Sequence, residues 1–189
     1  MPVTTDSFGF LIAYLIPGFL FLWGLGPSVP VFRDWLSVPT AAAPTVGSFL
    51  FATIASMAAG LLLSALRWVV VDSLYHRTGI PAPQWNFASL AGRLPAFEGI
   101  VTNHYRFYQA YSNALVALVI VFFVSLTTTK DEFVVASLDH LVLLGVACIL
   151  ILASRDCLRK YYARATDLML PMENRKILRP ENRKVSKRK

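Results

Sequence analysis

The run Val46–Leu66 most constrains what this chain can fold into, because its 21 residues include no Asp, Glu, Lys or Arg. It reads VGSFLFATIASMAAGLLLSAL and ends at Arg67. A helix needs about 20 apolar residues to cross a hydrocarbon core of about 30 Å. A run this long and this apolar does not suit the surface of a soluble domain, which carries roughly a quarter charged residues. We therefore expect it to form a membrane-spanning helix.

Long uncharged stretches recur along the chain, since only 15% of its 189 residues are charged. Their positions predict an all-α polytopic integral membrane protein with four transmembrane helices, at about 8–25, 46–71, 108–127 and 133–154. An alternative with three spans requires the first or the last of these segments not to cross. We expect residues 1–154 to form the transmembrane domain, with a cytoplasmic loop at 72–106, and residues 155–189 to form a cytoplasmic amphipathic helix and basic tail.

The distribution of basic residues predicts the orientation, because Lys and Arg concentrate on the cytoplasmic side. The last 35 residues hold 12 of the 18 Lys and Arg, which predicts that both termini are cytoplasmic. No basic residue precedes the first apolar run, so we interpret that run as a retained span rather than a cleaved signal.

Two local patterns predict how the spans pack. Pro17 and Gly18 lie near the centre of the first span, where proline removes one backbone hydrogen bond and bends the helix. The bend is either a packing feature or a hinge. In the second span small residues recur at every fourth position, a spacing that lets helices approach closely. These residues are Ala52, Ser56, Gly60 and Ser64.

Polar side chains concentrate where the second span ends and the third begins. The candidates for a ligand or gate site are Arg67, Asp72, His76, Arg77, His104, Arg106, Gln109 and Asn113. They flank one loop, so we expect the two groups to lie close together. They form either a hydrogen-bonded bracket between the spans or a site at the inner mouth of an assembly. Arg67, near the end of its span, is expected to extend its guanidinium to the headgroups.

Asp139 and His140 are the polar pair inside the fourth apolar segment. One interpretation places them at the outer headgroups, where they would cap the helix. The other gives them a pore-lining or proton-sensitive role, because a histidine can change charge near physiological pH.

The motifs of catalysis and metal binding are missing from the sequence. It contains no GxSxG, HExxH, CxxC or glycine-rich phosphate loop. We therefore expect no catalytic residues, no metal site and no cofactor, and the chain is not expected to be an enzyme.

The basic tail can attract several partners. Its charged residues are Arg175, Lys176, Arg183, Lys184, Lys187, Arg188 and Lys189, together with Arg179 and two glutamates. Anionic lipid headgroups are the expected partner, and a cytoplasmic protein is a second candidate. Nucleic acid or a nucleotide would use the same charges, but no aromatic residues are interleaved to support stacking.

Three stretches, DSFGFLIAYLIPGFLFLWGL, RWVVVDSLYHRTG and NHYRFYQAYSN, carry a resemblance. The chain resembles small four-pass bacterial inner-membrane proteins of unassigned activity over about residues 6–125. The resemblance implies a bacterial cytoplasmic membrane and brings no catalytic residues. The architecture is also similar to small multipass effectors of bacterial defence systems.

Three functions follow as hypotheses. The first is a homo-oligomeric, channel-like or membrane-perturbing effector gated from the cytoplasmic side, because a four-helix unit this small has little interior of its own. The second is a non-catalytic anchor or accessory subunit that docks a cytoplasmic partner. The third is a small transporter or membrane-embedded enzyme.

Overall fold

The protein is all-helical, and four of its helices are long and apolar enough to cross a membrane. The structure, a computed structural model, describes residues 5–36, 46–128 and 138–170. The four candidate spans are Phe8–Leu25, Val46–Arg77, Leu94–Leu126 and Leu141–Met169. This confirms the predicted fold class. The second and third spans extend further into the 72–106 region than the sequence predicted, so much of that loop is helix.

Three of the four long helices contain a π-helical segment, in which each hydrogen bond reaches one residue further than in an α-helix. In the first, η1 (Leu11–Leu15) joins α1 (Thr5–Phe10) to α2 (Ile16–Leu25). In the second, η2 (Trp68–Asp72) joins α4 (Val46–Arg67) to α5 (Ser73–Arg77). In the third, η4 (Val101–Tyr105) joins α6 (Leu94–Ile100) to α7 (Arg106–Thr128).

The remaining elements are α3 (Pro30–Leu36), the short 3₁₀ helix η3 (Phe87–Leu90) and α8 (Leu138–Met169). Elements η3 and α6 are separated by a turn in which Gly92 has a φ of +77°. Helix α8 continues without a break past residue 154.

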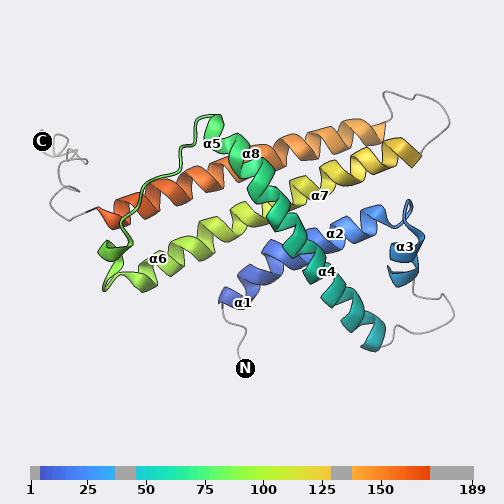
Figure 1. Cartoon of the computed structure of the whole chain (residues 1–189), viewed down its shortest axis with the longest axis horizontal. Coiled ribbons are helices and arrows are strands. Elements are labelled where there is room, and N and C mark those ends of the chain that lie inside the picture. Colours follow the sequence, from blue (N-terminus) through green and yellow to red (C-terminus); the bar gives the residue numbers. More distant parts are fainter. Residues whose placement is uncertain (1–4, 37–45, 129–137, 171–189) are drawn as a thin grey trace, which may run out of the picture.

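The helices form an open layer rather than a closed bundle (Figure 1). Helices α7 and α8 lie side by side and run in opposite directions, and α2 packs against both α7 and α4. Helix α4 crosses this layer obliquely, and its first half extends beyond it. The outer faces of α4 and α8 are rich in exposed apolar side chains such as Phe49, Leu62 and Leu152. Such faces suit lipid or a neighbouring protein.

The crossing of α2 and α4 brings backbone against backbone. A Cβ atom added to Gly18 would lie 1.8 Å from the Ser56 carbonyl oxygen, and one added to Gly60 would lie 2.0 Å from the Tyr14 carbonyl oxygen. Ser56 and Gly60, from the middle of the small-residue stripe, are buried there, whereas Ala52 and Ser64 are half-buried. Glycine is therefore required at both helices for this approach.

The second half of α8 is held against residues 75–105. Buried Tyr75, Leu158, Tyr161 and Ala165 form a common core, surrounded by Trp85 and other aromatic rings. Polar cross-links join the same segments: Arg155 donates to the Thr78 carbonyl at 2.9 Å, Trp85 to Thr166 at 3.0 Å, and Arg93 to the Leu168 carbonyl at 2.8 Å. This half of α8 is therefore bound to the segment that connects the second and third spans.

The α2–α4 crossing predicts that Gly60→Ala lowers the free energy of unfolding by about 3 kcal/mol, because backbone must shift to admit the methyl group. The measurement is reversible unfolding by SDS in mixed micelles. Gly145→Ala in α8 is the matched control, since nothing lies within 4 Å of a Cβ there. It should change stability by less than about 0.5 kcal/mol. Equal effects of the two substitutions would contradict the crossing.

Candidate functional site

A buried ion pair lies where the second long helix meets α7. Arg67 Nη1 lies 2.9 Å from Asp72 Oδ1 and 3.2 Å from Oδ2, and the two side chains are only 4% and 15% exposed. The expectation that Arg67 reaches the headgroups is therefore wrong. The reason is the carboxylate on the next turn, which provides the charge partner that lipid would otherwise have to supply.

The π segment η2 makes this pair geometrically feasible. Arg67 and Asp72 are five residues apart, and in a regular α-helix such residues point about 140° away from each other. The wider turn of η2 (Trp68–Asp72), which begins directly after Arg67, brings positions five apart onto one face. Because of the extra residue in this turn, the side chains of Arg67 and Asp72 lie on the same side of the helix.

Tyr108 closes the pair from α7. Its hydroxyl donates to Asp72 Oδ1, and its ring lies 5.1 Å from the Arg67 guanidinium. The Tyr108 side chain is fully buried. Asp72 thus accepts hydrogen bonds from two donors, one on each helix, so that the charge of the carboxylate is covered on both sides.

On α7, two amide side chains also reach the first span around Pro17. Pro17 cannot donate the hydrogen bond that the Ala13 carbonyl would receive in a regular helix. The buried Asn113 Nδ2 donates to that carbonyl at 2.8 Å. One turn earlier, Gln109 Nε2 donates to the Tyr14 hydroxyl at 3.2 Å. The residues before Pro17 are thereby joined to α7 by polar contacts within the protein.

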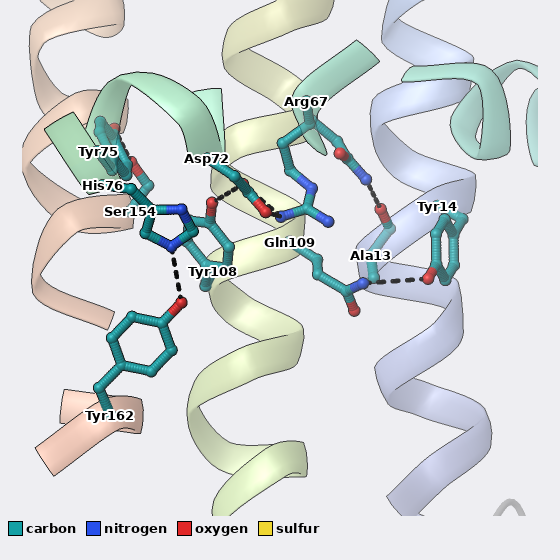
Figure 2. A network of polar contacts seen from close by, with 11 residues as sticks. Ala13, Tyr14, Arg67, Asp72, Tyr75, His76, Tyr108, Gln109, Ser154 and Tyr162 are labelled. Carbon is teal, nitrogen blue, oxygen red and sulfur yellow. Dashed lines mark hydrogen bonds and ion pairs between the residues drawn. The ribbon is translucent and has the colours of Figure 1, made fainter. Parts of the chain in front are cut away.

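We define the Arg67 cluster as Arg67, Asp72, Tyr108, Gln109 and Asn113. Figure 2 shows four of these residues, Arg67, Asp72, Tyr108 and Gln109, between α2 and α8, with Tyr14 and Ala13 on one side and Tyr75 and Ser154 on the other. The hydroxyl oxygens of Tyr75 and Ser154 lie 2.6 Å apart, which connects α5 to α8. Polar contacts therefore extend across all four long helices.

The candidates from the sequence divide into two groups. Arg67 and Asp72 pair with each other, whereas Gln109 and Asn113 contact the first span. Arg106 donates to Gln109 Oε1 at 3.1 Å. His76 and His104 instead contact α8: His76 Nε2 lies 3.0 Å from the Tyr162 hydroxyl, and Arg164 donates to His104 Nε2 at 2.5 Å. Arg77 is exposed at the end of α5.

Some predicted residues lie outside the description of the structure. Asp139 and His140 fall in the first turn of α8, but their side chains are outside the described residues. The tail residues from Arg175 to Lys189 are outside them as well. Sequence reasoning missed Tyr108 and Tyr75. The available signal was their position next to long apolar runs, where a buried tyrosine hydroxyl requires a partner.

Four polar atoms of the site are buried with no hydrogen-bond partner in the described part of the chain. They are Ser56 Oγ, Arg67 Nε, Ser112 Oγ and Asn113 Oδ1. Their side chains belong to residues between 0% and 3% exposed. An unmade hydrogen bond of this kind costs about 1–3 kcal/mol. In this conformation the interior therefore contains polar atoms whose capacity for hydrogen bonds is unused.

The chemistry of the site is electrostatic and conformational. The described residues contain no group of three or more His, Cys, Asp or Glu side chains placed to hold a metal ion. An open groove of about 390 Å³ lies elsewhere, between Gly79–Pro83 and the second half of α8. It is separate from the Arg67 cluster.

Comparisons with protein-family models, with curated proteins and with solved structures give no match to this chain. By helix length and hydropathy it is a multi-pass membrane protein with four candidate spans. Its function must accordingly be argued from the site itself.

The buried pair predicts a strong coupling between Arg67→Gln and Asp72→Asn. Either change alone should cost about 3–5 kcal/mol of unfolding free energy, because it leaves one buried charge unpaired. The double variant should recover at least about 1 kcal/mol of the summed loss. The measurement is a double-mutant cycle of unfolding in micelles. Asp156 and Lys160, whose side chains are 57% and 53% exposed, provide a control pair with weak coupling. Additive effects at Arg67 and Asp72 would contradict the contact.

The backbone donor that is missing at Pro17 predicts that Pro17→Ala reduces the loss of unfolding free energy caused by Asn113→Leu. With alanine at position 17 the Ala13 carbonyl regains a backbone donor, so the Asn113 amide is no longer its required partner. In the parent, Asn113→Leu should cost about 1–3 kcal/mol, and in the Pro17→Ala background less than half of that. The same unfolding assay measures both. An undiminished cost would mean that Asn113 does not replace the missing donor.

Proposed function

We propose that this chain is one subunit of a homo-oligomeric, channel-like membrane protein. In this proposal the contacts among Arg67, Asp72 and Tyr108 hold the closed state. The observation that carries it is the ion pair buried within a long apolar helix and formed through a π turn. Ionisable side chains inside spans are expensive and mark functional sites, and π segments occur frequently at such sites.

The arrangement of helices supports an assembly. The described helices lie in an open layer, with α4 crossing it obliquely (Figure 1). A layer encloses no passage by itself, whereas several copies can enclose one between them. The exposed apolar faces of α4 and α8 provide surface for neighbouring subunits as well as for lipid.

The position of the cluster supports control from the cytoplasm. The distribution of Lys and Arg favours cytoplasmic termini and a cytoplasmic connection between the second and third spans. Arg67 and Tyr108 then lie toward the cytoplasmic end of the spans. The second half of α8 contacts this connection through Arg155, Trp85 and Arg93, so a displacement there can reach η2. The resemblance noted in the sequence favours the cytoplasmic membrane of a bacterium and a role as an effector.

The proposal predicts that Asp72→Asn opens the channel. The substitution removes the charge that Arg67 requires, so the closed state loses stability relative to any state in which Arg67 is hydrated. A shift of 1.4 kcal/mol changes the ratio of the two states about tenfold, and we expect at least that increase in ion flux. The measurement is ion efflux from liposomes that contain purified protein, whose stoichiometry is determined by mass in mild detergent.

Two further variants make this test specific. Tyr108→Phe removes one donor and no charge, so its flux should lie between those of the parent and Asp72→Asn. Asp156→Asn changes an exposed carboxylate on α8 and should leave the flux at the parent level. If verified oligomers of both the parent and Asp72→Asn fail to pass ions, the proposed function is wrong.

A further inference from the structure

We infer that, when the channel opens, the junction of α2, α4 and α7 is exposed to the passage between subunits and lines the path of small monovalent anions. This inference rests on the proposed function and adds the route and the class of substrate. We call this junction the polar seam and define it by Ser56, Arg67, Gln109, Ser112 and Asn113.

Four buried polar atoms on α4 and α7, two helices that pack against each other, lack a hydrogen bond. Ser56 Oγ, Arg67 Nε, Ser112 Oγ and Asn113 Oδ1 have no partner in the described part of the chain, and all belong to buried side chains. Buried polar groups in native proteins nearly always have partners, so four unpaired atoms on two neighbouring helices require an explanation. Water entering the seam would satisfy all four. The unpaired atoms therefore favour the entry of water into the seam over the closed state.

The seam residues lie on adjacent faces of α7 and on one face of α4. Ser112 follows Tyr108 by one helical turn, and Asn113 follows Gln109 by one turn, so two adjacent faces of α7 present polar groups. Ser56 and Arg67 belong to the buried face of α4. Together they mark a polar line along helices that are otherwise apolar. An ion crossing the bilayer needs such a line, because hydrocarbon offers no replacement for its hydration shell.

The charges along the seam favour anions. Asp72 is the sole acidic residue in α2, α4, η2 and α7, all of which lie in the described part of the chain. Its carboxylate is covered by Arg67 Nη1 and the Tyr108 hydroxyl. The Arg67 Nε–H donor has no such cover. Arg106 adds a second positive charge one turn before the amides that face α2. A path lined in this way attracts anions and repels cations.

The helices around the seam contain segments that can change register. The seam is closed at the α2–α4 crossing, where Gly18 and Gly60 approach the partner backbone. Opening requires α4 to shift relative to α2. The π segments η1 and η2 lie directly next to the helical stretches that carry these contacts, and the extra residue in each allows a local change of helical register.

Ion selectivity provides the first test. In planar bilayers the Asp72→Asn channel should pass chloride over potassium by at least about fivefold, since Arg67 retains its charge beside the path. The double variant Arg67→Gln, Asp72→Asn should lower this ratio to less than about twofold. A channel that prefers potassium, or a ratio that does not depend on Arg67, would overturn the inference and leave the proposed function intact.

Accessibility provides the second test, and its readout is independent of current. In a background with Cys148→Ser and Cys157→Ser, the thiol introduced by Ser112→Cys should react with a water-soluble methanethiosulfonate. The reaction should be at least about tenfold faster when Asp72→Asn is also present. Ile149→Cys on the exposed apolar face of α8 is the control and should stay unreactive in both backgrounds.

The outcomes separate the two proposals. Flux through Asp72→Asn without reaction at Ser112→Cys would overturn the polar seam as the route, while the channel function would stand. No flux from verified oligomers would instead contradict the channel function itself. Chloride preference together with reaction at Ser112→Cys supports both.

Discussion

The contact between Arg67 and Asp72 is the interaction on which the rest of the structure depends. An arginine buried inside a membrane protein needs a carboxylate, and here that carboxylate is on the same long helix, five residues away. The pair forms only because η2 widens the turn between them. Tyr108 then fixes α7 to the pair, and Tyr75 with Ser154 fixes α8 to the same helix. One ion pair therefore organises contacts from three helices.

The first span is attached in a different way. A side chain of α7 replaces a missing backbone hydrogen bond there, and no ion pair is involved. Pro17 leaves the Ala13 carbonyl without its usual donor, and Asn113 supplies one. Helix α2 begins at Ile16, two residues before Gly18, the glycine of the tight crossing. Pro17, the amide contact at Ala13 and the close approach to α4 therefore lie within one short stretch of the chain. Packing that is this close, beside polar atoms that have no partner, suits a structure that changes between two states.

The sequence predicted the number of spans because hydropathy depends on composition over about 20 residues. The spacing of Ser56 and Gly60 indicated a packing surface, and the partner helix came only from the structure. The burial of Arg67 could not be predicted, since it depends on a π turn that no residue pattern identifies. Tyr108 was missed for a related reason, because its partner Asp72 lies 36 residues away in the chain. Long-range polar contacts need the fold before they can be recognised.

The central claim is that the ion pair, rather than either residue alone, holds the closed state. The most direct measurement is the single-channel open probability of the charge-swapped pair, Arg67→Asp with Asp72→Arg, compared with each single swap. The account predicts that both single swaps open the channel, because each places two like charges together, and that the double swap restores a low open probability. A double swap that stays as open as the single swaps would contradict it.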